Sequence, residues 1–151
     1  MSNILLINPP FNIAKENYDS SVSVGLLSIA SYLDSRGVKV KMLDGAREKN
    51  FWPCLEKEIL DSNYAGLSVM TTQVPGALKI SQIIRKIKPN CKIIWGGAHP
   101  TFFPVETAAH SLIDIAVYGE GEETFYEIVN GKNLAEITGI LYKQDKKVIK
   151  N

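Results

Sequence analysis

Short apolar runs alternate along the chain with segments of helical periodicity, and this alternation narrows the accessible folds more than any other feature. The apolar runs cover residues 3–8, 38–43, 64–70, 91–95 and 114–118. The first run is almost wholly apolar, which is typical of a parallel strand buried on both faces, whereas the second alternates and predicts a less buried strand. Strands separated by helices in this way predict right-handed crossovers and a parallel sheet covered by helices on both faces.

Helical patterns fill the segments between these runs. The first helix is expected from apolar residues that recur at helical spacing, namely Val24, Leu27, Ile29, Ala30 and Leu33. Ser21 or Ser23 is placed to cap its start and Gly37 to end it. Pro75 suits the first turn of a later helix. The remaining helices are expected over residues 53–62, 75–87, 104–111 and 122–129.

Together these elements predict an α/β fold, a flavodoxin-like (Rossmann-like) three-layer sandwich with a parallel sheet of strand order 2-1-3-4-5. Residues 139–142 and 148–149 predict a small C-terminal hairpin. A length of 151 residues suits one domain, so we expect residues 1–151 to form a single domain. In such a sheet the loops that follow the strands surround one cavity, and these loops cover residues 9–22, 71–75, 96–103 and 119–122.

Composition excludes several classes of protein. A net charge of +1 gives no field that would attract nucleic acid or acidic lipid, so neither a nucleic-acid partner nor a membrane is expected. No apolar run reaches the ~18 residues of a membrane span, and a cytoplasmic location is predicted. Cys54 and Cys91 are far apart and have no CxxC or Cys/His spacing, which predicts two reduced thiols and no zinc or iron–sulfur site built from this chain alone.

Glycines end two of the predicted strands. Gly96 and Gly97 follow the fourth strand, and Gly119 and Gly121 follow the fifth. The carboxyl edge of a parallel sheet is where ligands bind in folds of this class. Because glycine has no side chain, paired glycines at this edge let a large, flat ligand lie against the backbone.

Three familiar chemistries do not fit these motifs. A dinucleotide site needs GxGxxG after the first strand, where this chain has Asn8-Pro9-Pro10-Phe11. A phosphate-accepting receiver domain needs acidic residues after the first and third strands, but Asn8 and Thr71-Thr72 stand there. No Ser, Cys or His occurs in a nucleophile elbow or triad spacing, so no catalytic residue is predicted.

The motifs taken in order resemble those of one family. They are Pro9-Pro10, the segment 24–33 followed by Gly37 and Asp44, then Gly66-Leu67-Ser68, Gly96-Gly97-Ala98-His99-Pro100 and Gly119-Glu120-Gly121-Glu122. In this respect the chain resembles, over almost its whole length, the N-terminal cobalamin-binding domain of cobalamin-dependent radical SAM enzymes. Several motifs in one order are far more specific than any single glycine pair.

The resemblance implies that the domain grips cobalamin and that the nucleotide tail, with its dimethylbenzimidazole, enters the crevice at the carboxyl edge. The residues expected to bind the cofactor on this basis are Ser68, Thr71, Thr72, Gly96, Gly97, Ala98, Gly119, Glu120, Gly121 and Glu122. Simpler interpretations stay open. The glycine pair also suits a tight turn, the Ser68 and threonine hydroxyls also suit local hydrogen bonds, and the two glutamates also suit the start of a helix.

Histidine is absent from the loop after the first strand. Cobalamin enzymes of the same fold that bind cobalt through a protein imidazole carry DxHxxG in this loop, but residues 9–22 contain no His, and Asp19 is followed by two serines. Only His99 and His110 occur in the whole chain. The resemblance therefore implies base-off cobalamin with no protein histidine on the metal and no metal-ligating residue, with Phe11, Tyr18 and Val22 below the corrin.

The cysteines that a radical SAM barrel needs are also missing. Such a barrel holds a [4Fe–4S] cluster through CxxxCxxC and uses S-adenosylmethionine, and this chain has only Cys54 and Cys91. We therefore expect no catalysis from this chain alone. The resemblance implies a radical SAM barrel C-terminal to it, in a methyltransferase or cyclase that presents cobalamin for methyl transfer or related radical chemistry.

Two other functions remain compatible with the sequence. One is the same fold without corrinoid, acting as an interaction or substrate-positioning module. The other is a stand-alone flavodoxin-like enzyme for a small molecule, which would need a catalytic pair that the motifs do not reveal. For the cobalamin-binding hypothesis, we expect a bulky residue in place of Gly97 to abolish binding and leave the fold intact.

Overall fold

The strands join into one sheet. A computed structural model describes residues 3–11, 13 and 22–151 of the chain. In this part the sheet has the order β2-β1-β3-β4-β5-β6-β7. The strands are β1 (Ile4–Asn8), β2 (Val40–Asp44), β3 (Tyr64–Ser68), β4 (Lys92–Gly96), β5 (Ile115–Val117), β6 (Ile140–Gln144) and β7 (Lys147–Lys150). Pairing is parallel from β2 through β5 and antiparallel between β5, β6 and β7. The predicted order 2-1-3-4-5 is confirmed.

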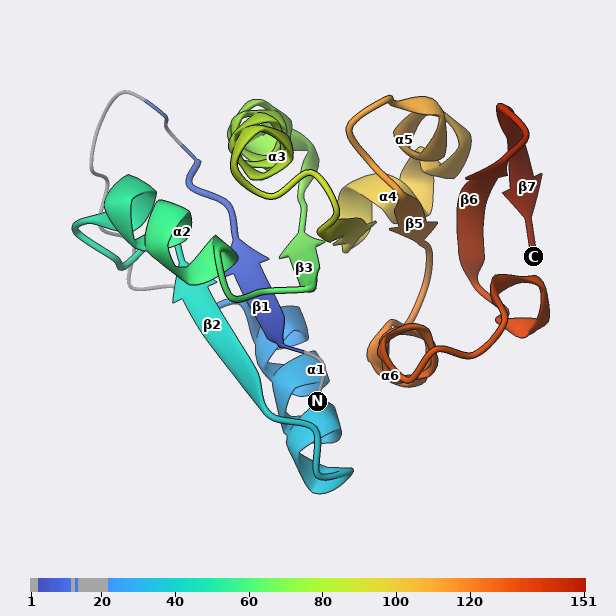
Figure 1. Cartoon of the computed structure of the whole chain (residues 1–151), viewed down its shortest axis with the longest axis horizontal. Coiled ribbons are helices and arrows are strands. Elements are labelled where there is room, and N and C mark those ends of the chain that lie inside the picture. The colour runs from blue at the N-terminus through green and yellow to red at the C-terminus, as the bar shows by residue number, and fades with distance from the viewer. Residues whose placement is uncertain (1–2, 12, 14–21) are drawn as a thin grey trace.

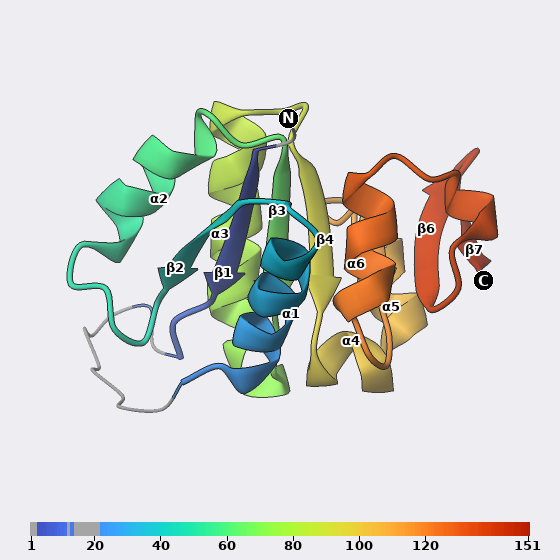
Figure 2. The same cartoon turned by 90° about the horizontal axis from the view of Figure 1, so that it is seen from below.

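Helices cover both faces of the sheet, which confirms the predicted three-layer arrangement (Figure 1). The helices are α1 (Val24–Ser35), α2 (Phe51–Ile59), α3 (Val74–Ile87), α4 (Ala98–Phe102), α5 (Pro104–Ala109) and α6 (Glu122–Val129), with 3-10 turns η1 (Thr71–Gln73) and η2 (Leu134–Glu136). In Figure 1, α1 and α6 lie below the sheet, and α3, α4 and α5 lie above it. In Figure 2 the parallel strands run downward, so their carboxyl ends lie at the lower edge.

Strand β1 shows why the chain needs both helical layers. Its five residues are all buried. Leu5 and Ile7 pack with residues of α2 and α3, and Ile4 and Leu6 pack with residues of α1 and α6. Alternate side chains of a strand point to opposite faces, so an all-apolar strand needs cover on both faces. Removing the side chain of such a residue costs about 2–5 kcal/mol.

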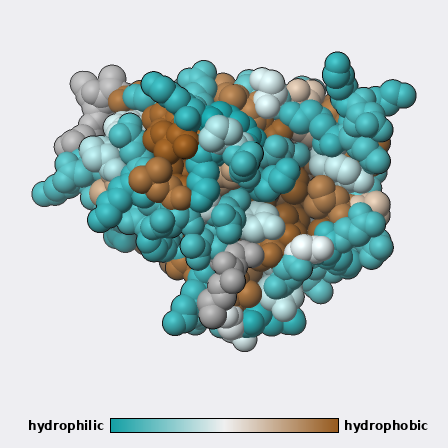
Figure 3. Space-filling view, viewed as in Figure 1, coloured by the Kyte–Doolittle hydropathy of each residue, from teal (hydrophilic) through white to brown (hydrophobic). Residues whose placement is uncertain are grey.

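The outer surface contrasts with this core. Figure 3, which has the same orientation as Figure 1, shows a mostly hydrophilic face on which hydrophobic residues form separate patches. The described part of the chain contains no helix that is both long and apolar enough to cross a membrane. Cys54 and Cys91 are both free thiols, and burial raises the pKa of the Cys91 thiol to about 11.

Several boundaries differ from the sequence-based expectation. Helix α2 begins at Phe51 and carries Pro53 in its first turn, where proline costs no helical hydrogen bond. The short helix α4 (Ala98–Phe102) lies within the segment 96–103, which the sequence predicts to be a loop. The C-terminal hairpin is present, and it also extends the sheet, because β6 pairs with β5.

The buried face of α1 is also shifted. Leu26, Ala30 and Leu33 are buried, whereas Val24 and Leu27 are 76% and 42% exposed. Residues at positions i, i+4 and i+7 share one face of a helix, so the buried face runs along Leu26, Ala30 and Leu33, with Ile29 partly buried beside it. Ser23 is the N-cap residue but makes no side-chain cap hydrogen bond. Ser21 lies outside the described residues.

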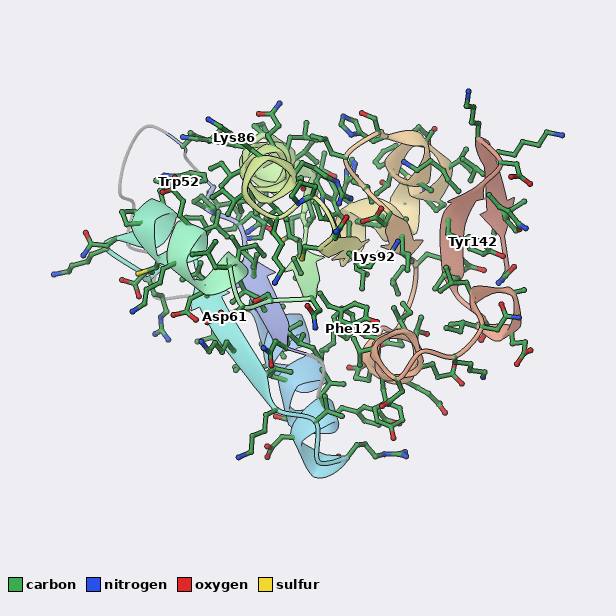
Figure 4. The ribbon with its side chains drawn as sticks, in the orientation of Figure 1. Trp52, Asp61, Lys86, Lys92, Phe125 and Tyr142 are labelled. Carbon is green, nitrogen blue, oxygen red and sulfur yellow. The ribbon has the colours of Figure 1, made fainter. Side chains whose placement is uncertain are left out.

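Gly66 in β3 offers a direct test of the packing between sheet and helix. A Cβ atom there would lie 2.6 Å from Cε2 of Phe125 and 3.0 Å from a methyl group of Leu6. Figure 4 shows the Phe125 side chain on α6 beside the sheet. We therefore expect Gly66→Val to lower the free energy of unfolding by about 1–3 kcal/mol through overpacking, and Phe125→Leu in the same chain to recover part of it.

The matched control for this measurement is Gly96→Ala, since a Cβ atom there would approach nothing closer than Val117 Cβ at 3.8 Å. Urea unfolding of the three variants and the double variant measures the effects. Equal stability of Gly66→Val and the parent chain would show that α6 does not press on β3 as described.

Candidate functional site

A pocket of about 110 Å³ opens at the carboxyl edge of the sheet, between α1 and α6. Its floor comes from four neighbouring strands and consists of Leu6, Gly66, Leu67, Ser68, Ile94, Gly96 and Val117. One wall is the first part of α1, with Gly25, Leu26 and Ile29. The other wall is the start of α6 and the loop before it, with residues 119–122 and Phe125. The pocket is therefore mainly apolar, with two glutamates beside it.

Most of the predicted site residues come together here. Those that line the pocket are Ser68, Gly96, Gly97, Gly119, Glu120, Gly121 and Glu122. Thr71, Thr72 and Ala98 do not line it, because the two threonines form the exposed turn η1 and Ala98 begins α4. A larger pocket of about 390 Å³ lies at the opposite, amino edge, and none of the predicted site residues lines it.

The glycines of the site have different structural roles. Gly97 has a φ of +95°, and a Cβ atom there would lie 2.9 Å from the backbone nitrogen of Val69. The turn itself thus requires glycine at this position, because neither the backbone angle nor the neighbouring strand admits a side chain. Contrary to expectation, a bulky residue at Gly97 would disturb the local fold.

Gly25, Gly96 and Gly119 border the pocket differently. A Cβ atom on Gly25 or Gly119 would meet nothing within 4 Å, and one on Gly96 would meet only Val117. Gly25 was missed as a site residue. Glycine inside a helix costs about 1 kcal/mol relative to alanine, and this cost was the sequence signal that a special requirement exists there. Open space above three glycines forms a cradle that side chains would fill.

Polar contacts fix the two walls. The Ser28 hydroxyl of α1 donates to Oε1 of Glu122 at 2.5 Å, across the gap between α1 and α6. Glu122 is also the first residue of α6, where a carboxylate complements the helix dipole. One turn further along both helices, Tyr32 and Tyr126 meet edge to face with ring centroids 6.2 Å apart. These contacts hold α1 and α6 side by side.

A second polar network holds the start of the loop after β1. The buried Gln73 side chain donates to the Asn8 side chain at 2.9 Å and to the Pro9 carbonyl at 2.7 Å, and its oxygen accepts from the Met70 N–H. Asn8 in turn donates to Asp44 at 2.8 Å. The network fixes Asn8 and Pro9 in place. Tyr18, predicted to lie below a corrin, is outside the described residues, and Phe11 and Val22 are exposed.

His99 lies in α4 at the edge of this region. Its Nδ1 is 3.3 Å from the Thr71 hydroxyl, and its ring centroid is 5.2 Å from that of Phe103. Burial lowers the pKa of His99 below its usual 6.5, although Glu106 acts in the opposite direction. His99 does not line the pocket. Among the described residues, no group of three or more His, Cys, Asp or Glu side chains is arranged to hold a metal ion.

The family described as the B12 binding domain matches residues 15–129. The chain belongs to this family. Seven of the predicted site residues line the pocket within the matched segment.

Two curated relatives match nearly the whole chain. An uncharacterized methyltransferase of Pyrococcus horikoshii is 32% identical over 96% of this chain and 33% of its own length. The anaerobic magnesium-protoporphyrin IX monomethyl ester cyclase of Synechocystis is 30% identical over 97% of this chain and 32% of its own length. The chain thus spans about a third of these relatives.

Solved structures share the fold. The radical S-adenosylmethionine methyltransferase TsrM of Kitasatospora setae, with cobalamin and a [4Fe–4S] cluster bound, matches with a TM-score of 0.82 at 21% identity, over 99% of this chain and 31% of that one. The same enzyme with tryptophan and an S-adenosylmethionine analogue matches with a TM-score of 0.83 at 20% identity, over 99% of this chain and 30% of that one. These matches confirm the Rossmann-like fold of a B12-binding domain.

The residues present fit cobalamin, the cofactor of the family. A tail that carries an aromatic base needs an apolar slot that the backbone lines without side chains. Gly25, Gly96 and Gly119 leave such a slot open above Leu6 and Ile94.

We expect His99 to make stability depend on pH. Its folded-state pKa lies below 6.5, so protonation is less favourable in the folded than in the unfolded chain, and stability falls as the pH drops from about 6.5 through the folded-state value. His99→Gln removes this component. Urea unfolding at pH 7.5 and 5.0 should show a smaller pH difference for His99→Gln than for the parent chain. An equal difference would contradict the burial of His99.

Proposed function

We propose that this chain binds cobalamin at the carboxyl edge of its sheet, with the dimethylbenzimidazole tail in the pocket between α1 and α6. The open space over Gly25, Gly96 and Gly119 carries this proposal. An apolar floor favours an aromatic base, because burial of apolar surface drives binding. Membership of the B12-binding family supports the same cofactor.

The size of the pocket limits which part of cobalamin it can hold. Pockets that enclose a whole drug-sized ligand measure about 300–1,000 Å³, and this one measures about 110 Å³. It suits one flat group, so the corrin ring would lie outside, over the edge of the sheet. Large apolar side chains are exposed near that edge, on α1, after β3 and in α4, namely Val24, Leu27, Met70 and Phe102. They give the corrin an apolar surface to rest on.

Ser68 is the polar group best placed to recognise the tail. It ends β3 and lines the pocket. Within residues 3–11, 13 and 22–151, no hydrogen bond engages its hydroxyl, which leaves both donor and acceptor free for a ligand. Glu122 is different, since its carboxylate already accepts from Ser28. We therefore assign Ser68 a binding role and Glu122 a role in holding the wall.

We further propose that the cofactor is bound base-off and without a protein histidine on cobalt. Residues 9–22 contain no histidine, and His99 does not line the pocket. When bound, cobalamin supplies a cobalt centre that carries methyl groups or takes part in radical chemistry. The chain's own residues bind the tail, exclude water from it and orient the ring.

The reaction itself is assigned to a larger protein. The relatives are about three times as long as this chain, which leaves room for a second domain. We propose that this domain is a radical SAM barrel with a [4Fe–4S] cluster and S-adenosylmethionine, to which residues 1–151 present the cobalamin as a single domain in the cytoplasm. The names of the two relatives and of TsrM support a methyltransferase or cyclase.

Titration of the chain with hydroxocobalamin tests the function. We expect binding with a spectrum of the base-off form and weaker binding of cobinamide, which lacks the nucleotide tail. Ser68→Ala should weaken the binding of cobalamin and leave that of cobinamide unchanged. Absence of binding at about 100 µM, which corresponds to about −5.5 kcal/mol, would contradict the proposal and favour a scaffold without corrinoid.

Gly25→Ala separates binding from folding. An alanine in α1 should raise stability by about 0.5–1 kcal/mol, because nothing lies within 4 Å of the new methyl group. The same methyl group stands at the edge of the pocket and should weaken the binding of cobalamin. Thermal unfolding and absorbance titration measure the two effects.

The control for this variant is Ser31→Ala, which changes an exposed residue of the same helix away from the pocket. It should leave binding unchanged. If Gly25→Ala bound cobalamin as tightly as the parent chain, the tail would not lie against α1.

A further inference from the structure

The Thr101 hydroxyl joins the two glycine turns that border the pocket. Thr101 lies in α4. This helix directly follows the turn at the end of β4 (Figure 2). Its Oγ1 donates to the Gly97 carbonyl at 2.8 Å and accepts from the Gly119 N–H at 3.1 Å. One side chain thus links the turn that follows β4 to the turn that follows β5.

This link lies just beyond the point where the pairing between β4 and β5 stops. Strands β4 and β5 pair only at Ile94 with Ile115 and at Trp95 with Ala116. Residues beyond these pairs receive no support from the β4–β5 ladder. Beyond these pairs, the Thr101 hydroxyl accepts a hydrogen bond from the Gly119 N–H and so holds this residue to α4.

The segment that Thr101 holds needs such support. Gly119 has a φ of +75°, and the next glycine, Gly121, is two residues away. Glycines lose more conformational freedom on ordering than other residues. A ligand that binds against this segment must meet that cost unless the segment is already ordered, so preorganisation raises affinity.

We propose that Thr101 is a positioning residue for the nucleotide tail of the cofactor. It fixes residues 119–121 as the wall against which the heteroaromatic base packs. This inference rests on the proposed cobalamin function. Thr101 itself makes no contact with the ligand in this proposal. It acts entirely through its hydrogen bonds with the Gly119 N–H and the Gly97 carbonyl.

Thr107 provides a matched control within the neighbouring helix. Its hydroxyl donates to the Phe103 carbonyl four residues earlier at 2.7 Å, as Thr101 does to Gly97. Thr107 is buried, lies in α5 and does not line the pocket. Thr101 is exposed. A purely structural role of the hydroxyl therefore predicts a larger effect at Thr107 than at Thr101.

The test compares Thr101→Val, Thr101→Ser and Thr107→Val in the 151-residue chain. Thr101→Val should weaken the binding of hydroxocobalamin about two- to tenfold, the loss expected for one ordinary hydrogen bond. It should leave the binding of cobinamide unchanged and speed amide exchange of Gly119 measured by NMR. Thr101→Ser should restore affinity and exchange. Thr107→Val should lower stability and change neither.

The outcomes separate the two proposals. Unchanged cobalamin affinity in Thr101→Val, or equal losses for cobalamin and cobinamide, would overturn the positioning role. If Thr101→Val does not fold, Thr101→Ser decides, since it keeps the hydroxyl and should keep both the cobalamin affinity and the Gly119 exchange rate of the parent chain. A loss of affinity in Thr101→Ser with unchanged Gly119 exchange would overturn the positioning role. If the parent chain binds no cobalamin, the proposed function fails together with this inference, and Gly119 exchange still reports whether the hydroxyl holds the turn.

Discussion

Parallel pairing of β2, β1, β3, β4 and β5 is the constraint on which the rest of the structure depends. Because these strands all run the same way, every one of them ends at the same edge, and every loop that follows a strand begins there. Each parallel connection must then cross over a face of the sheet, which places α1 on one face and α2 and α3 on the other. The pocket is a consequence of this arrangement, since it lies where the edge passes between α1 and α6.

The walls of the pocket depend on contacts between residues far apart in sequence. Ser28 and Glu122 meet across 94 residues, and Tyr32 and Tyr126 meet one turn further along the same helices. Two contacts at matching positions keep α1 and α6 side by side. On the floor, Gly66 leaves room for Phe125, so the same α6 that forms a wall also seals the sheet beneath it.

Much of the fold was predictable from the sequence, because the patterns that specify its strands and helices are local. The apolar runs fixed the positions of β1 to β5, and glycines and prolines marked the ends of the helices. The resemblance then predicted the family and the cofactor. What the sequence did not reveal depends on tertiary contacts. Nothing local shows that β6 pairs with β5, or that Gln73 reaches Asn8 from 65 residues away. The requirement for glycine at Gly97 likewise comes from the Val69 backbone.

In the candidate site too, the features with a local sequence pattern were predictable, and those that depend on tertiary contacts were not. Glycine pairs after strands predicted the edge and most of the residues that border the pocket, but not which glycines face open space. Gly25 was missed because it lies in a helix, and Thr71 and Thr72 were included because they follow β3, although the turn η1 carries them away from the pocket. Distinguishing these positions requires knowing where α1 and α6 lie.

The central claim is that the pocket between α1 and α6 holds the nucleotide tail of cobalamin. A crystal structure of the chain with hydroxocobalamin tests it most directly. The account predicts the dimethylbenzimidazole between Gly25 and Gly119, above Ile94, with its nitrogen free of cobalt and the corrin outside the pocket. A complex in which the base stays on cobalt, or lies away from this pocket, would contradict it.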